Sequence, residues 1–128
     1  MTTRTQMIEA LDGVESVAAR LAEVASRTDA RRKSDLIEAR RDLAIRTMAI
    51  MALGERYRPI ADNDDLYAEL RRRQGHLRAT IAEHQSAWSA PSIDSDDAAY
   101  VAASAAVQSV GRDFMRWVRQ TIESLPEA

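Results

Sequence analysis

The chain has 128 residues, of which 45% are hydrophobic and 30% charged, a size that suits one domain able to fold without cross-links. It contains no cysteine, which excludes a disulfide scaffold, a thiolate metal site and a cysteine nucleophile. With 18 basic and 20 acidic residues its net charge is −2, a balance that argues against binding to nucleic acid or a membrane surface. We therefore expect a single helical-bundle domain over residues 1–128.

Targeting signals are not visible in the sequence. Residues 1–7 lack the apolar segment of a secretory signal, and no run approaches the ~18 apolar residues that cross a bilayer. The expected location is the cytoplasm. Charge is unevenly placed, because residues 29–78 carry twelve basic and nine acidic side chains while residues 79–128 carry three and seven. Such a dipolar chain could pair weakly with itself or with a charged partner.

Apolar residues recur at steps of three and four in the first half of the chain, the spacing of one helix face. Thr3 and Gln6 resemble a capping box at the start of the first predicted helix. Asp29 and Ser34 are both possible caps for the second helix, and Pro59 is expected to end it. The first apolar seam contains Met7, Leu11, Val14, Ala18, Leu21 and Ala25. The second contains Leu36, Leu43, Thr47, Ile50, Gly54 and Tyr57.

The second half repeats this pattern. Residues 62–65 form a dense N-cap signal with carboxylates where the helix dipole favours them. Residues 89–92 break the third helix, Ser95 caps a fourth, and Pro126 closes it. The third seam contains Tyr67, Leu70, Gln74, Leu77, Ile81, His84 and Trp88. The fourth contains Tyr100, Ala103, Val107, Val110, Phe114, Trp117 and Thr121. Four helices with short connections predict an all-α, antiparallel up-down-up-down four-helix bundle.

Both histidines, His76 and His84, lie on the third predicted helix. Their separation places them two turns apart and ~80° around the axis, so they cannot hold one metal ion without carboxylates from other helices. His84 lies on the apolar seam, where a hydrogen-bonded structural histidine is the simplest expectation. A metal ligand and a small-molecule contact are the functional alternatives.

Four polar residues interrupt the apolar seams: Thr47, Gln74, His84 and Thr121. A buried polar group left unpaired costs ~1–3 kcal/mol, so we expect these side chains to bond to one another and fix helix register. The alternative is a polar pocket in the middle of the bundle, lined also by Trp88, Tyr100 and Trp117.

Basic clusters at residues 31–33, 40–41 and 71–73 are interleaved with acids, as on solvated helix faces. No glycine-rich phosphate loop, nucleophile elbow or His-Glu-x-x-His signature is present, so no catalytic machinery is visible. Each predicted helix carries one glycine, which suggests close packing or a cavity wall.

Two segments resemble bacterial hemerythrin-like domains over residues 35–126. They are His84-Gln85-Ser86-Ala87-Trp88 with the later Tyr100, Arg116 and Glu123-Ser124-Leu125-Pro126, and Ala39–Ala44 leading to Glu55-Arg56-Tyr57-Arg58-Pro59. The resemblance implies four helices around a di-iron centre held by histidines and carboxylates. Counting back from the two prolines places Ala49, Leu53, Arg116 and Gln120 at family ligand positions. It therefore implies a degenerate member without metal.

From the sequence we expect a non-catalytic bundle without a cofactor that acts by protein–protein interaction or homodimerisation. The alternatives are a di-iron or single-metal oxygen-responsive hemerythrin-like protein, and a small-ligand-binding bundle. The candidate polar core or pocket comprises Thr47, Gln74, His76, His84, Arg116, Gln120 and Thr121. The candidate aromatic pocket or interface comprises Tyr57, Trp88, Tyr100 and Trp117. The expected partner is another protein or a second copy, with no nucleic acid and no membrane.

Overall fold

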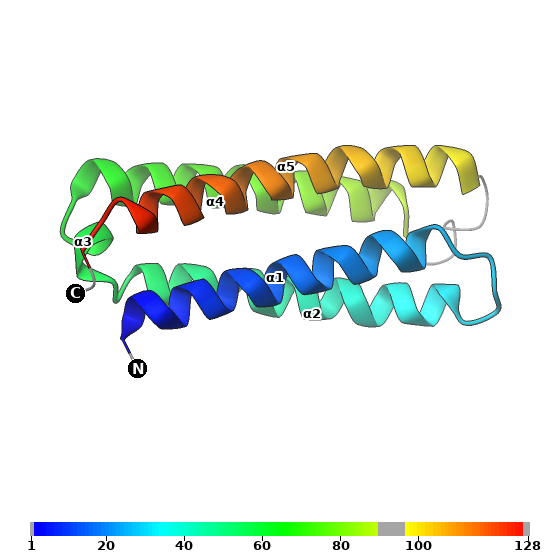
Figure 1. Cartoon of the computed structure of the whole chain (residues 1–128). Coiled ribbons are helices and arrows are strands. Elements are labelled where there is room, and N and C mark those ends of the chain that lie inside the picture. The colour runs from blue at the N-terminus through cyan, green and yellow to red at the C-terminus, as the bar shows by residue number, and fades with distance from the viewer. Residues whose placement is uncertain (1, 90–96, 127–128) are drawn as a thin grey trace.

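A computed structural model of the chain describes residues 2–89 and 97–126, and these residues form helices and no strand. The all-α prediction is confirmed. The helices are α1 (Thr3–Ala25), α2 (Arg32–Gly54), α3 (Arg58–Ala61), α4 (Asp64–Ala87) and α5 (Asp97–Glu123). Four of them are long, and the short α3 separates α2 from α4 (Figure 1). None of the helices in the described part is long and apolar enough to cross a membrane.

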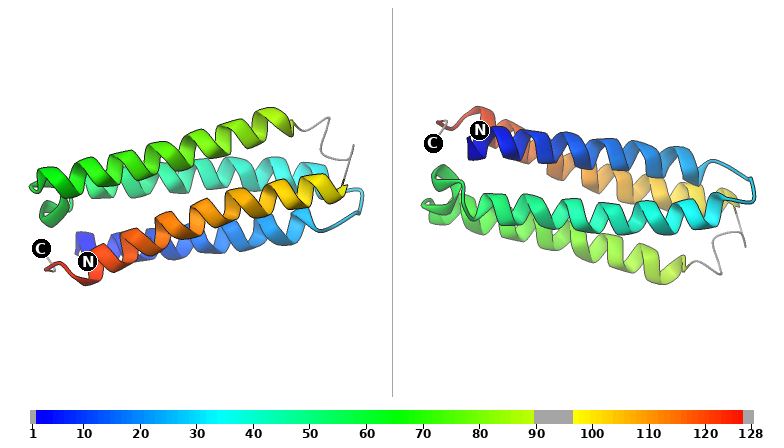
Figure 2. Two further views of the ribbon diagram at one scale, coloured as in Figure 1. Left: turned by 90° about the horizontal axis from the view of Figure 1, so that it is seen from above. Right: turned by 90° about the horizontal axis from the view of Figure 1, so that it is seen from below.

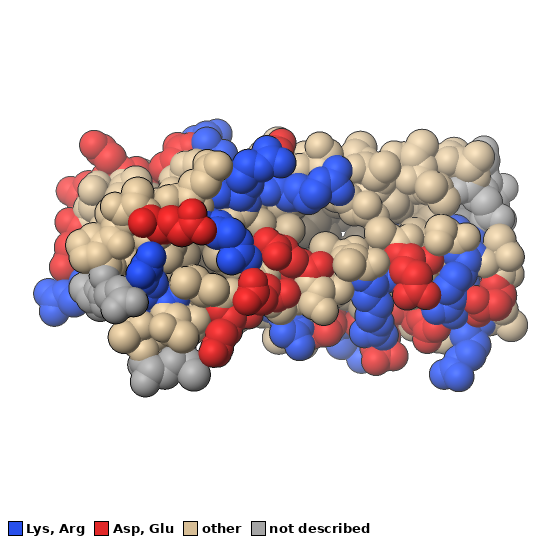
Figure 3. All heavy atoms as spheres, in the orientation of Figure 1, with Lys and Arg blue, Asp and Glu red and all other residues tan. Residues whose placement is uncertain are grey.

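The four long helices lie side by side, and each runs opposite to the long helix before it (Figures 1 and 2). α1 packs against α2 and α5, and α4 packs against α5 and α2. The α1–α2 pair has the most extensive contact and the α2–α4 pair the least. On the face shown in Figure 3, charges of both signs alternate over α1 and α2, whereas the first half of α5 is largely uncharged.

Two of the predicted helix starts are wrong by a few residues. The cap of α1 is Thr2, whose hydroxyl accepts the Thr5 N–H at 3.1 Å, so the box predicted at Thr3 does not form. α2 follows Arg31, and neither Asp29 nor Ser34 is its N-cap. The predicted Ser95 cap of α5 lies outside the described residues. The polar signal before α4 is confirmed, because the Asn63 side chain accepts the Leu66 N–H.

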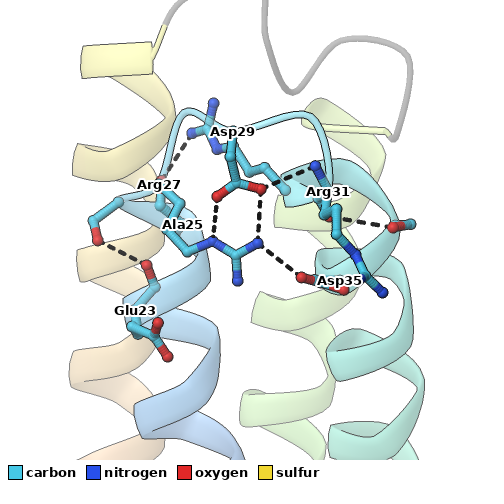
Figure 4. A network of polar contacts seen from close by, with 9 residues as sticks. Glu23, Ala25, Arg27, Asp29, Arg31 and Asp35 are labelled. Carbon is cyan, nitrogen blue, oxygen red and sulfur yellow. Dashed lines mark hydrogen bonds and ion pairs between the residues drawn. The ribbon is translucent and has the colours of Figure 1, made fainter.

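A network of ion pairs and hydrogen bonds links the residues that connect α1 to α2 (Figure 4). The Arg27 guanidinium donates to both oxygens of Asp29, at 2.6 and 2.9 Å, and to Asp35 at 2.8 Å. Asp29 also accepts the Arg31 N–H at 2.9 Å, which explains its place just before α2. The Arg27 hydrogen bonds hold the pKa of Asp29 well below its usual range. Arg32 donates to the Ala25 carbonyl at 2.8 Å and so satisfies one of the carbonyls that a helix end leaves open.

The predicted end of the second helix at Pro59 is also wrong. α2 ends at Gly54, and Tyr57 turns the chain with an extended backbone (ψ 98°). Pro59 then lies in the first turn of α3, where its missing N–H has no helical partner to lose.

The core divides into two clusters. The larger fills the half of the molecule next to α3 and comprises Met7, Leu11, Val14, Ile50, Tyr57, Ile60, Leu70, Leu77, Phe114, Met115, Val118 and Ile122. The smaller lies near the opposite end and comprises Val24, Ala25, Leu36 and Tyr100. We call them the large cluster and the small cluster.

The apolar seam predicted for the last helix differs from its buried face. Met115, Val118 and Ile122 are buried, whereas the predicted Val110 and Trp117 are only half-buried. α5 packs against both α1 and α4, so its buried stripe is wider than one three-four seam.

Candidate functional site

A cavity of about 80 Å³ lies between the two clusters. Its walls come from all four long helices and include Val14 and Met115 from the large cluster and Tyr100 from the small one. Most of the lining is aliphatic, contributed by Val14, Ala18, Leu21, Leu43, Leu77, Ile81, Val107 and Met115. The core is therefore interrupted where the two clusters meet.

Polar side chains gather around Tyr100 at one part of this cavity. Arg40 of α2 donates to the Tyr100 hydroxyl at a long 3.4 Å, and its guanidinium carbon lies 6.0 Å from the ring centre. The His84 ring stacks on Tyr100 at 5.6 Å between centroids, and its Nε2 lies 3.4 Å from the Ser104 hydroxyl oxygen. Trp88 meets the same ring edge-on at 5.3 Å. We call Arg40, His84, Tyr100 and Ser104 the polar cluster.

The electrostatics of the cavity are one-sided. Its lining contains Arg40 but no aspartate or glutamate. Within the described ranges, Arg40 has no ion pair with a carboxylate. Burial lowers the pKa of His84, and the positive charge of Arg40 lowers it further. His84 is therefore neutral near pH 7, and Arg40 supplies the charge of the polar cluster.

The hydrogen-bond network predicted among the seam polar residues does not form in the described part of the chain. The Thr47 hydroxyl donates to the Leu43 carbonyl of its own helix at 2.8 Å, and His84 meets Ser104 instead. Gln74 is buried but lines a separate surface cleft beside Met48, and Thr121 is half-buried. A polar residue on a helix can satisfy itself against the preceding turn, which removes the need for a cross-helix partner.

The remaining polar candidates do not reach the cavity. His76, Arg116 and Gln120 are exposed, and Arg116 pairs with Asp113 at 3.3 Å. Ala49, placed at a ligand position by the hemerythrin-like resemblance, is exposed as well. Across residues 2–89 and 97–126, no group of three or more histidines and carboxylates is positioned to hold a metal ion.

The aromatic candidates separate into two places. Tyr100 belongs to the polar cluster, and Trp88 contacts its ring. Tyr57 is completely buried in the large cluster, where its hydroxyl donates to the Pro126 carbonyl. Trp117 lies at the edge of that cluster, with the Arg73 guanidinium 4.9 Å from its ring centre. Of these four aromatic residues, Tyr100 lines the cavity.

Arg40 and Ser104 were not among the site residues predicted from the sequence. Arg40 was assigned to a solvent-exposed basic pair, and Ser104 lies in an alanine-rich segment. Both signals were present, because Arg40 lies four residues after the seam residue Leu36 and Ser104 lies four after Tyr100.

A surface groove between α1 and α5 lies next to the cavity. The two share Ala18, Gln108 and Met115, and the groove encloses about 490 Å³. Figure 3 shows a hollow in the surface between α1 and α5. Three arginines of α5 line the groove, Arg112, Arg116 and Arg119, against one acid, Glu15. Arg119 donates to Asp12 at 2.9 Å and to Glu15 at 3.1 Å.

A second feature is the outer face of α2, which exposes large apolar side chains. Ile45 is 62% exposed, Met48 65% and Ile37 41%. α2 thus carries apolar residues both toward the core and toward solvent.

The comparisons with known proteins give no identification: no family model, curated protein or solved structure matches the chain.

Proposed function

We propose that the protein is a non-catalytic, antiparallel up-down-up-down four-helix bundle that binds a small, largely apolar molecule in the cavity between its two clusters. The side-by-side long helices of alternating direction support the bundle topology. The interrupted core, with the polar cluster at the interruption, supports the binding role.

The aliphatic side chains that line the cavity have no packing partner on that side, so the cavity forfeits dispersion contacts. A ligand that fills it would restore the lost contacts. The few convergent polar groups on an apolar wall are the usual composition of a small-molecule site.

Binding is better supported than catalysis. The Ser104 hydroxyl oxygen lies 3.4 Å from His84 Nε2, so a nucleophile and base pair here would still need a third group to orient the imidazole. No carboxylate lines the cavity to orient the imidazole.

A cavity-filling variant tests the proposal. Ala18→Leu adds side-chain volume where cavity and groove meet, whereas Ala106→Leu makes the same change on the exposed face of α5. We expect Ala18→Leu to stabilise the protein by about 0.5–2 kcal/mol and to remove ligand-induced rises in melting temperature. The screen would use toluene, hexanamide and hexanoate, and Ala106→Leu should respond like the original chain. If none of these probes raises the melting temperature of the original chain, the proposal fails.

Homodimerisation through α2 is the second candidate, and the exposed Ile45 and Met48 favour it. An antiparallel pair of α2 helices centred on Met48 places Arg41 of each copy opposite Glu55 of the other, since both lie seven residues from Met48. Both side chains are exposed. A single helix pair is a small interface, so the association should be weak and concentration-dependent.

Light scattering over a dilution series tests this dimer. Met48→Lys should abolish it, Arg41→Glu should weaken it, and adding Glu55→Arg to Arg41→Glu should restore it. A monomer at every concentration would rule the dimer out.

The resemblance to hemerythrin-like domains stays a prediction. Elemental analysis of protein isolated without chelators checks the di-iron alternative, for which stoichiometric iron lost on His76→Ala would be the supporting result.

A further inference from the structure

We infer that the cavity selects a small organic monoanion, a carboxylate with an apolar body, whose charge is met by Arg40. This inference rests on the proposed function and specifies its ligand class. It follows from the charge, the shape and the surroundings of the cavity.

Arg40 is a half-buried cation that has no carboxylate partner within residues 2–89 and 97–126. It lines the cavity, and among the residues that the structure describes it bonds weakly to the Tyr100 hydroxyl alone. By contrast, Arg27 and Arg119 each bond to two carboxylates. A guanidinium that is partly removed from water and left unpaired gains most from a planar anion able to accept two N–H groups.

The cavity wall selects the rest of the ligand. Aliphatic side chains dominate the lining, so the body of the ligand should be apolar and small. The second basic group, His84, is neutral near pH 7 because burial and Arg40 lower its pKa. One positive charge suits a carboxylate better than a phosphate dianion, since a second negative charge would be desolvated without a partner.

The surface beside the cavity favours the same charge. The groove that shares lining residues with the cavity is lined by Arg112, Arg116 and Arg119 against Glu15. Arg119 bonds to Asp12 and Glu15, and Arg116 pairs with Asp113, whereas Arg112 has no ion pair among the described residues. A basic side chain in the groove next to a cavity that contains Arg40 raises the local concentration of anions.

Matched pairs of probes test the inference. Calorimetric titration of the full chain would compare straight-chain carboxylates, from propionate to octanoate, with the primary amides of the same length. The amide keeps the shape and removes the charge. We expect the carboxylate to bind at least about tenfold more tightly, as hydrogen bonds to a charged group do.

Arg40→Gln should remove this preference. It should lower the affinity for the carboxylate and leave the affinity for the amide within about twofold of that of the unsubstituted chain. Arg40→Lys should keep part of the preference for the carboxylate. This variant also tests the inference if Arg40→Gln does not fold. Arg56→Gln is the matched control, because it removes the same charge from an exposed residue that does not line the cavity.

Equal affinity for acid and amide in the unsubstituted chain would overturn the inference, as would an equal loss in Arg40→Gln and Arg56→Gln. Inorganic phosphate binding more tightly than the carboxylates would overturn the ligand class. Failure of both acids and amides to bind would instead contradict the proposed function itself.

Discussion

The half of the molecule next to α3 and the level of the cavity are built from the same helices but packed differently. Near α3, a β-carbon added to Gly54 would lie 2.6 Å from the Leu70 side chain, and Tyr57 is completely enclosed. At the cavity, a β-carbon added to Gly111 would meet only Leu77, at 3.9 Å. One region therefore supplies stability, and the other leaves room for a ligand.

The largest expected effect is in the tightly packed half. Tyr57→Ala should cost about 3–5 kcal/mol, because it removes a fully enclosed aromatic ring from the large cluster. Tyr57→Phe keeps the ring and removes the hydroxyl that donates to the Pro126 carbonyl, so it should cost about 1 kcal/mol. Urea unfolding measures both. A loss below about 1 kcal/mol for Tyr57→Ala would mean that this half is not the packed core described here.

The two glycines should respond to the same substitution with opposite signs. Gly54→Ala forces a methyl group against Leu70, so we expect a net loss of about 1–2 kcal/mol despite its better helix propensity. Gly111→Ala has room for the methyl group and should gain up to about 1 kcal/mol. Thermal unfolding of the pair compares the regions directly. Similar shifts in both variants would contradict the difference in packing.

We expect the strongest pH dependence of the free energy of unfolding to come from His84, which lines the cavity. The pKa of His84 is lowered in the folded state, so the unfolded chain takes up this proton first. Its stabilising contribution is complete above its ordinary pKa of about 6.5 and is lost as the pH falls through the lower folded value. Between about pH 7 and about pH 5, the free energy of unfolding should fall further for the unsubstituted chain than for His84→Gln. Parallel curves for the two proteins would show that His84 keeps an ordinary pKa.

The smallest effect is expected at the α1–α2 connection. Arg27→Gln breaks the bonds to Asp29 and Asp35, but these groups lie in contact with solvent. The loss of stability should be slight and should largely disappear at about 1 M salt, where exposed charges are screened. A loss that persists in high salt would indicate a structural role beyond the ion pairs.

Periodicity alone was enough to predict the helical class and the approximate course of the four long helices. It could not place their ends, because Thr2 instead of Thr3 caps α1 and because α3 is a single turn too short to carry a period. The seam predicted for α5 also differed from its buried face. α5 packs against two neighbours, which widen its apolar stripe to include Met115 and Val118.

The candidate site was predictable only in part. His84 and Tyr100 were recognised because they lie on apolar seams, and they do adjoin the cavity. Arg40 was not, because a basic pair with acidic residues close on both sides, here Glu38 and Asp42, has the local pattern of a solvated face. Its position depends on how α2, α4 and α5 meet around Tyr100, which is a property of the assembled helices.

Entry of a small apolar acid between the two clusters can be observed by an NMR titration with hexanoate that follows the side-chain methyl groups. We expect shifts and ligand contacts concentrated at Leu43, Leu77 and Val107, which line the cavity, with Ile60 and Ile122 of the large cluster unchanged. Shifts confined to exposed methyl groups, or none at saturating hexanoate, would contradict this expectation.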